Sequence, residues 1–224
     1  MADISKGPKN KKSRGEETRQ RLLLVGARLF ALNGFRGVSM RNLAMEAEIN
    51  LATVGYHFGG KLGLYEAILQ SMIERRSEIF PSLEEVRERV DMLKQNKLTK
   101  SDLVKWFFGF FIRRSAGSQE TMWAALIITR ELAAPSELYP MLDEYLFTPI
   151  FESLGEILAV AMDGKVSTEE RAIVGTALIG MVLKFVHPKV LMTRIGWDEY
   201  TPENIEIITE VLCRRAVAFV GCQE

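Results

Sequence analysis

The sequence predicts an all-α protein, and three observations support this. Apolar residues recur three, four and seven positions apart, as on one face of a helix. Sustained alternation of apolar and polar residues, which is typical of half-buried strands, is missing. Ser, Thr or Asn precedes many of the periodic stretches and Gly or Pro often follows them, which divides the chain into separate helices.

The composition is that of a globular protein with unevenly spread charge. Of the 224 residues, 47% are hydrophobic and 26% are charged, which suits one large or two modest domains. The chain is formally neutral, yet residues 1–61 hold eleven Lys or Arg and only five Asp or Glu. A basic N-terminal part favours a polyanionic partner, and the alternative is a solvated basic tail.

No targeting or membrane segment is expected. Residues 1–15 are polar and basic, without the apolar core of a secretory signal, and we expect a disordered tail there. No apolar run approaches the roughly 18 residues that a membrane span requires. These features predict a cytoplasmic protein that does not associate with membranes.

Three helices are predicted before residue 60. The first spans about 16–33 and ends at Gly34, because glycine readily takes the positive φ of a helix C-cap. Ser39 is a good N-cap for a short second helix, and Asn50 for a third over 51–58. Two short helices joined by a tight turn after a longer helix are the plan of a helix-turn-helix domain.

The third helix is expected to enter the major groove of DNA. Its outward face is slim and nearly uncharged, and Arg41 near the start of the second helix is able to reach a guanine edge or a phosphate. Hydroxyl, imidazole and ammonium groups suited to phosphate oxygens flank this face. The residues that we expect to contact DNA are Ser39, Met40, Arg41, Leu51, Ala52, Thr53, Gly55, Tyr56, His57 and Lys61.

Further helices are predicted throughout the rest of the chain. The first of them, over 61–80, carries an apolar stripe that includes Leu64 and Ile68 and ends at Pro81. The others are expected over 81–96, 99–114, 118–134, 135–162 with an interruption near Pro149, 167–186 and 201–220.

Residues 18–69 resemble the DNA-binding domain of the TetR family. The resemblance lies in Asn50-Leu51-Ala52-Thr53-Val54-Gly55-Tyr56-His57-Phe58-Gly59-Gly60-Lys61 and in the core positions Phe30, Gly34, Phe35, Leu43 and Ala44. Two positions depart from the family: Glu48 stands in the turn where Gly is usual, and Gly55 where an aromatic residue is frequent. A left-handed backbone at Glu48 would cost roughly 1 kcal/mol.

Beyond residue 80 the chain resembles the CecR (YbiH)-like subfamily, in Ile128-Thr129-Arg130-Glu131, Ala177-Leu178-Ile179-Gly180 and Arg194-Ile195-Gly196-Trp197. The resemblance implies a TetR-type fold: a helix-turn-helix domain over 16–62, a linking helix over 61–80, and an effector-binding and dimerisation domain over 63–224. It also implies a homodimeric repressor of palindromic double-stranded operator DNA that a small molecule releases.

The effector pocket is expected between the middle helices, and ordinary core packing is the alternative for its aromatic residues. We expect its lining to include Trp106, Phe110, Met122, Leu126, Arg130, Phe147, Phe185 and His187, with Glu131 as a further polar group. The last two long helices are the predicted dimer interface, and packing within one chain is the alternative. The interface residues would be Ala172, Leu178, Ile179, Val182, Ile205, Ile208, Leu212 and Ala216.

An enzyme is the competing class. The chain has only two His and two Cys, and it lacks HExxH, the paired Glu-x-x-His of di-iron bundles, a phosphate loop and a nucleophile elbow. We therefore expect no catalytic residue, metal or cofactor. The alternatives left open are a DNA-binding helical protein without an effector and a small helical metal-binding enzyme.

Overall fold

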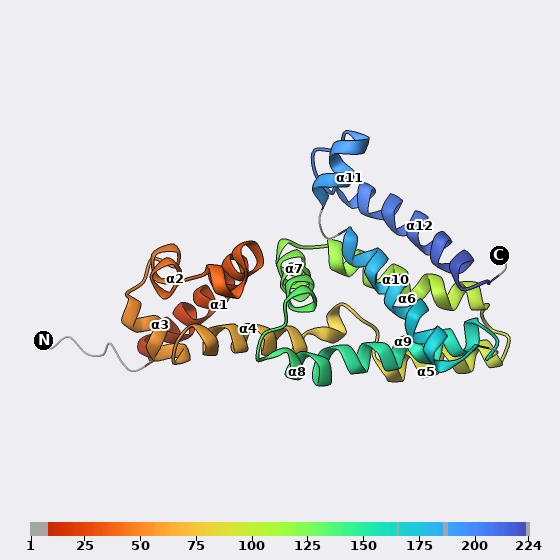
Figure 1. The fold of residues 1–224 in the computed structure, drawn as a ribbon, viewed down its shortest axis with the longest axis horizontal. Coiled ribbons are helices and arrows are strands. Elements are labelled where there is room, and N and C mark those ends of the chain that lie inside the picture. The colour runs from red at the N-terminus through yellow and green to blue at the C-terminus, as the bar shows by residue number, and fades with distance from the viewer. Residues whose placement is uncertain (1–8, 165, 186–187, 223–224) are drawn as a thin grey trace, which may run out of the picture. The chain divides into compact units, whose positions relative to one another are not determined.

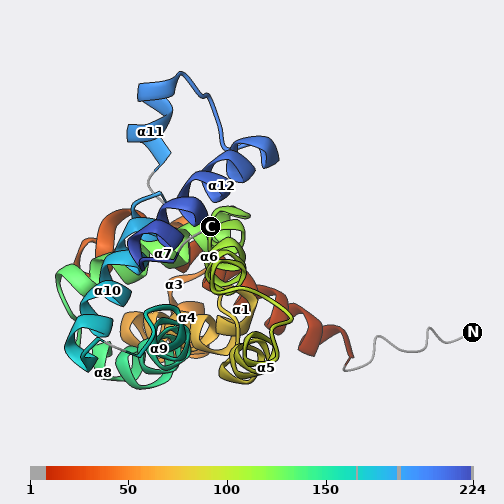
Figure 2. The same ribbon diagram turned by 90° about the vertical axis from the view of Figure 1, so that its right-hand side faces the viewer.

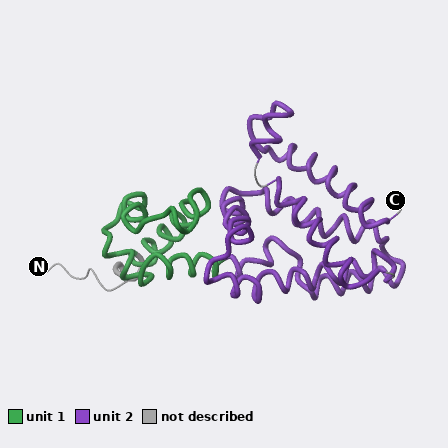
Figure 3. Tube along the Cα trace, viewed as in Figure 1, with its two compact units in different colours: residues 1–71 green, residues 72–224 purple. Residues whose placement is uncertain are grey.

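The computed structural model describes residues 9–164, 166–185 and 188–222, and all regular structure within these ranges is helical. The chain divides into two compact units, residues 1–71 and residues 72–224 (Figure 3). Within the described ranges, no single helix is both long and apolar enough to cross a membrane. One pair of helices, Thr168–Lys184 and Pro188–Ile195, meets the length and composition requirement when taken together, but the two are bent by 64° relative to each other.

The N-terminal unit contains α1 (Lys9–Gly37), α2 (Met40–Glu46), α3 (Leu51–Phe58) and most of α4 (Lys61–Glu74), as Figure 1 shows. Helix α1 begins seven residues before the predicted start, so residues 9–15 are helical, while residues 1–8 lie outside the described ranges. Its continuity breaks at Gly34, whose φ of 71° is the positive value that the sequence predicted there.

The core of the N-terminal unit is small and tightly fitted. Phe30 is 1% exposed and meets the ring of Tyr65 edge-on at 4.8 Å between centroids. Gly26 allows α1 to approach α4, because a Cβ there would lie 2.9 Å from the Cδ1 atom of Ile68. The residues predicted to face inward, including Leu43, Ala44 and Val54, are buried.

The C-terminal unit holds the remaining helices (Figures 1 and 2). They are η1 (Arg76–Glu78), α5 (Leu83–Lys94), α6 (Lys100–Ala116), α7 (Gln119–Ala133), α8 (Tyr139–Leu142), η2 (Asp143–Phe147), α9 (Thr148–Ala161), α10 (Thr168–Lys184), α11 (Pro188–Ile195) and α12 (Pro202–Phe219). Helix α6 is the centre of its core, with Phe107, Phe108 and Phe111 at most 1% exposed. Helix α12 packs along α6, and α9 packs against both α5 and α10.

Three elements of this unit differ from the prediction. Helix α4 ends at Glu74 rather than near residue 80. The Arg75 guanidinium donates to Glu78 and the Arg76 guanidinium donates to the Ile73 carbonyl, and these bonds hold a short 3₁₀ turn. The interruption near Pro149 is a π-helix, η2, directly before α9. Helix α11, which extends away from the other helices of this unit in both views, was not predicted.

Candidate nucleic-acid interface

Two side chains fix the ends of the short helices that the sequence predicted. The Asn42 N–H donates to Ser39 Oγ at 3.1 Å, which caps α2. The Ala52 N–H donates to Asn50 Oδ1 at 2.9 Å, which caps α3. Between the two helices Glu48 has a φ of 54°, the left-handed conformation expected for a position where the family usually has Gly. The caps and the turn are therefore as predicted.

Helix α3 presents the predicted face to solvent. Tyr56 is 87% exposed and Leu51 is 44% exposed, whereas Val54 is fully buried against the core of the unit. A Cβ at Gly55 would meet no atom within 4 Å, so this position lies open. The exposure that DNA contact requires is present, and the contacts themselves stay predictions.

Helix α2 contributes the rest of this surface. Arg41 is exposed. Met45, which was not among the predicted contact residues, is 68% exposed on the same helix. An ion pair of 2.6 Å between Arg28 and Glu46 ties α2 to α1. Because both partners are more than a third exposed, this pair contributes to orientation more than to stability.

Lys61 points into the unit rather than outward. Its Nζ atom donates to the carbonyl oxygens of Phe35 at 3.1 Å and Val38 at 3.0 Å. The same atom lies 4.4 Å from the centroid of the Phe35 ring. In this structure the ammonium therefore contacts the segment that leads into α2, and the predicted phosphate contact stays a prediction.

A close approach between α3 and α4 depends on a glycine that sequence reasoning missed. Gly59 and Gly60 have positive φ values of 70° and 140° and make the turn. A Cβ added to Gly63 would lie only 1.9 Å from the carbonyl oxygen of Phe58, so no side chain fits there. The available signal was a third glycine four residues after Gly59, within the first turn of the next helix.

The predicted effector residues lie in different local surroundings, and their role as a pocket lining stays a prediction. Trp106 packs beneath the guanidinium of Arg89 at 4.1 Å, Phe110 beneath that of Arg114 at 5.5 Å, and Phe147 against the ring of Tyr139 at 5.9 Å. On α7, Met122 and Leu126 are half-buried and Arg130 is exposed. The backbone carbonyl of Phe185 accepts a hydrogen bond from the Tyr200 hydroxyl. His187 lies outside the described residues. Glu131, 3% exposed, accepts from the Ser136 N–H and hydroxyl and so fixes the turn after α7.

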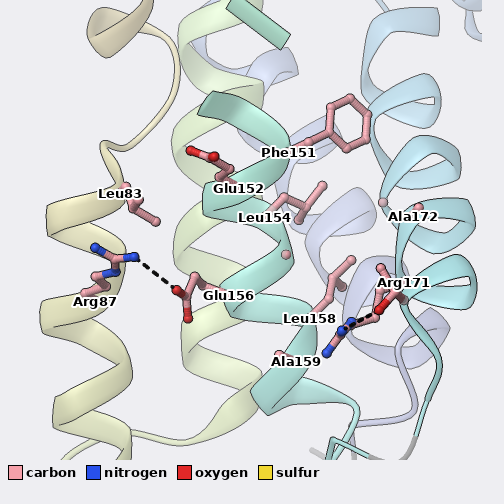
Figure 4. Close-up of a pocket in the computed structure, with 13 residues that line it drawn as sticks. Leu83, Arg87, Phe151, Glu152, Leu154, Glu156, Leu158, Ala159, Arg171 and Ala172 are labelled. Atoms are coloured by element: carbon pink, nitrogen blue, oxygen red, sulfur yellow. Dashed lines mark hydrogen bonds and ion pairs between the residues drawn. The ribbon is translucent and has the colours of Figure 1, made fainter. Parts of the chain in front are cut away.

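An open groove of about 520 Å³ lies between α5, α9 and α10 (Figure 4). It has an apolar floor that includes Leu154 and Leu158, and Arg87 points across it toward Glu156 at 3.4 Å. None of the predicted effector residues lines it. Its lining is Leu83, Arg87, Phe151, Glu152, Leu154, Gly155, Glu156, Leu158, Ala159, Thr168, Arg171, Ala172 and Gly175.

The predicted dimer residues need correction. Five of them pack inside the chain's own core and are at most 6% exposed: Leu178, Val182, Ile208, Leu212 and Ala216. Ile179 and Ile205 are half-buried, and Ala172 is exposed. The same two helices carry other apolar side chains in solvent, namely Ile173 (69% exposed), Ile207 (50%) and Val211 (40%). The five buried residues are therefore unavailable to a partner in this structure, and an interface on these two helices stays a prediction.

No three His, Cys, Asp or Glu residues of the described ranges gather in an arrangement that could hold a metal ion. Cys213 is buried, its Sγ donates to the Lys105 carbonyl at 3.5 Å, and burial raises its pKa to about 11. A thiol that stays protonated at neutral pH is a poor nucleophile.

The N-terminal unit matches a known class of DNA-binding domain. Residues 22–68, which include the capped α2, turn and α3, match the family model described as "Bacterial regulatory proteins, tetR family". The fold and this interface therefore define a transcriptional regulator of the TetR type.

The C-terminal unit identifies the branch of that class. Residues 102–221, more than half of the chain, match the model described as "HTH-type transcriptional dual regulator CecR, C-terminal domain". The chain therefore belongs to the TetR-type regulators with a CecR C-terminal domain, as the resemblance predicted. The HTH-type transcriptional dual regulator CecR of Shigella flexneri is 26% identical to it over 202 residues, which cover 89% of this chain and 89% of that protein.

Solved structures confirm the predicted fold class. HlyIIR, a hemolysin II transcriptional regulator, superposes with a TM-score of 0.60 at 20% identity, covering 91% of this chain and 97% of that one. AibR, solved in complex with isovaleryl coenzyme A and operator DNA, has a TM-score of 0.63 at 17% identity, covering 88% and 97%. At these identities the likeness concerns the fold alone.

Proposed function

We propose that the protein is a cytoplasmic, one-component repressor without catalytic activity. As a homodimer it binds palindromic double-stranded operator DNA through α2 and α3, and a small molecule releases it. The observation that carries this proposal is the exposed, slim face of α3, held by the Asn50 cap and anchored inward through Val54. A helix of this kind fits a major groove about 12 Å wide.

The polar groups around this face support DNA contact. The Ser39 hydroxyl accepts from the Asn42 N–H and retains its own proton for a phosphate oxygen. Arg41 is exposed, and its guanidinium suits a guanine edge. Tyr56 and His57 offer further donors, and their rings meet edge-on at 5.3 Å.

The exposed apolar side chains of α10 and α12 support a homodimer. Ile173, Ile207 and Val211 are large apolar groups in solvent on the helices where the TetR resemblance expects the partner. Ile207 and Val211 lie one helical turn apart on α12, and neighbouring exposed apolar residues are typical of an interaction surface. The dimer would present two copies of α3 about one DNA turn, ~34 Å, apart or a multiple of that distance.

Effector binding is supported by AibR, a structural neighbour that was solved with isovaleryl coenzyme A and operator DNA. The groove between α5, α9 and α10 has an apolar floor with a few charged groups, which is a common composition for small-molecule sites.

A regulator without an effector is the second candidate. A thermal-shift screen separates the two, and Ala159→Trp, which fills the groove, would remove the shift of a compound bound there.

Footprinting on DNA upstream of the protein's own gene, with and without a compound library, tests the proposal. We expect protection of an inverted repeat and its loss with an active compound. Arg41→Ala is expected to weaken binding and to relax the preference at one base pair, by about 1–3 kcal/mol in a competition titration. A purified protein that bound no inverted-repeat duplex at modest ionic strength would refute the assignment.

A further inference from the structure

Lys61 stands at the point where the DNA-reading helices meet the linking helix α4. It is the first residue of α4, and its ammonium reaches 26 residues back along the chain to Phe35. The segment that it contacts, Phe35 to Val38, lies between the break at Gly34 and the N-cap of α2. One side chain therefore connects the start of α4 to the entrance of α2.

The contacts around this half-buried ammonium are those of a structural cation. Two of its three N–H donors are used by carbonyl oxygens at 3.1 and 3.0 Å, and the face of the Phe35 ring lies 4.4 Å away. Carbonyl dipoles and an aromatic face compensate for the lost hydration of an ammonium. The Phe35 carbonyl lies in the last turn of α1, where it also accepts from the Val38 N–H at 3.5 Å, and the Val38 carbonyl follows that helix.

A second side chain of α4 holds the same segment. Tyr65 lies one turn after Lys61 on α4, and its ring meets Phe35 at 5.0 Å and Phe30 at 4.8 Å. Phe35 is thereby contacted by both the ammonium and the Tyr65 ring. The turn before α2 is consequently fixed to α4, and with it Ser39 and Arg41 at the start of α2.

We propose that Lys61 is a positioning residue, which sets α2 against α3 for DNA reading, and not a phosphate contact. This inference rests on the proposed function in one respect, namely that the protein binds DNA. A phosphate contact releases counterions, so its loss lowers the slope of log K against log salt by about 0.9. A positioning residue weakens binding without that change in slope.

The test compares Lys61→Met with Arg41→Met in the full-length protein. Binding is measured by fluorescence anisotropy against salt, on a labelled duplex of unrelated sequence and on the fragment upstream of the protein's gene. We expect Lys61→Met to bind that fragment about ten-fold more weakly with an unchanged slope on both duplexes. Arg41→Met is expected to reduce the slope.

Hydrogen exchange supplies a readout that does not depend on DNA. Amides of residues 35–46 should exchange faster in Lys61→Met than in the wild type, and at the wild-type rate in Arg41→Met. A slope reduced by about one with unaltered exchange would overturn the proposal and restore the phosphate contact. If the wild type bound neither duplex, the proposed function would fail, whereas the exchange of residues 35–46 would still decide the role of Lys61.

Discussion

The two units of the molecule are held together differently. In the N-terminal unit, Lys61 ties the start of α4 to the backbone before α2. In the C-terminal unit the aromatic residues of α6 form a large core, and apolar side chains such as Ile173 and Ile207 remain in solvent. Helix caps are common to both units, for example Asn50 in the first and Thr99 in the second. The first unit therefore holds a polar surface in place with few buried residues, and the second buries more apolar area.

Gly63 of the N-terminal unit is constrained more severely than a comparable glycine of the C-terminal unit. A Cβ at Gly63 would lie 1.9 Å from the carbonyl oxygen of Phe58, whereas a Cβ at Gly175 would lie 3.2 Å from the Leu154 side chain. The approach of α3 to α4 is therefore limited by backbone, and that of α10 to α9 by a side chain.

Replacing Gly63 with Ala is expected to have the largest effect. The added methyl group would overlap the Phe58 carbonyl, and α3 would have to move away from α4. Overpacking against backbone of this severity costs about 3 kcal/mol or more, enough to unfold a unit of this size. Urea titration followed by circular dichroism should show an early loss of helix, and DNA binding should be lost.

Gly15→Ala is the control for this change, because a Cβ at Gly15 meets no atom within 4 Å. Gly15→Ala should leave the stability of the N-terminal unit unchanged or raise it by up to about 1 kcal/mol, which is the difference in helix propensity between Gly and Ala. Equal stability of the two variants would contradict the close approach of α3 and α4.

The N-terminal unit was predictable because its signals are local. Ser39, Asn50 and Gly34 act on the backbone within a few residues, so each could be recognised from its neighbours in sequence. The contacts of Lys61 and Gly63 could not, since they depend on where α1 and α3 lie in space. A lysine that opens a helix after a recognition helix has the same sequence pattern whether it faces phosphate or carbonyl oxygens.

Substituting Ile207 with Asp is the next largest test, and it concerns the apolar surface of the C-terminal unit. Ile207 is 50% exposed in the single chain, so Asp should leave the protomer folded. Two unpaired carboxylates buried in a dimer interface would cost at least about 2 kcal/mol, which corresponds to roughly a thirty-fold weaker association. Sedimentation equilibrium measures this change.

Leu132→Asp is the matched control, because Leu132 is 49% exposed but lies on α7. It should not change the association. If both variants dimerised like the wild type, α12 would not form the interface, and if both dissociated, the surface would extend over α7.

The faces of the C-terminal helices were beyond sequence reasoning for a physical reason. Helix α10 carries small or apolar residues nearly all round, so spacing alone cannot separate Leu178, which faces the core, from Ile173, which faces solvent. The aromatic residues of α6 raise the same difficulty: Phe107 enters the core, whereas its neighbour Trp106 packs beneath Arg89. Which side receives the core depends on the neighbouring helices.

The thiol of Cys213 reports on the packing of the C-terminal unit alone, because both cysteines of the chain lie there. Burial raises its pKa to about 11 from the ordinary thiol value of 9.0. Between pH 9 and pH 11, the Cys213 thiol has lost its proton in the unfolded chain but retains it in the folded chain. The stabilising contribution of this thiol is therefore complete below pH 9 and decreases as the pH rises toward 11.

Denaturant titrations of the wild type and of Cys213→Ala at several pH values measure this contribution as the difference between the two free energies of unfolding. Effects of other titratable groups are common to both proteins and cancel in that difference. We expect the advantage of the wild type to shrink between pH 9 and 11. Iodoacetamide should alkylate Cys213 far more slowly in the folded than in the unfolded chain at pH 8, because only about one thiol in a thousand is ionised there. An advantage that stayed constant with pH would contradict the burial of this group.

The smallest expected effect returns to the turn between α2 and α3. Glu48 has a φ of 54°, a conformation that costs a residue with a side chain roughly 1 kcal/mol and glycine almost nothing. Glu48→Gly should therefore stabilise the N-terminal unit by about 0.5 kcal/mol, after allowance for the greater entropy of glycine in the unfolded chain. Asn96 in the C-terminal unit, with a φ of 56°, is the matched position, and because asparagine tolerates this region, Asn96→Gly should change the free energy of unfolding little. A loss of stability in Glu48→Gly would mean that the Glu48 side chain holds the turn, and that backbone geometry alone does not determine this connection.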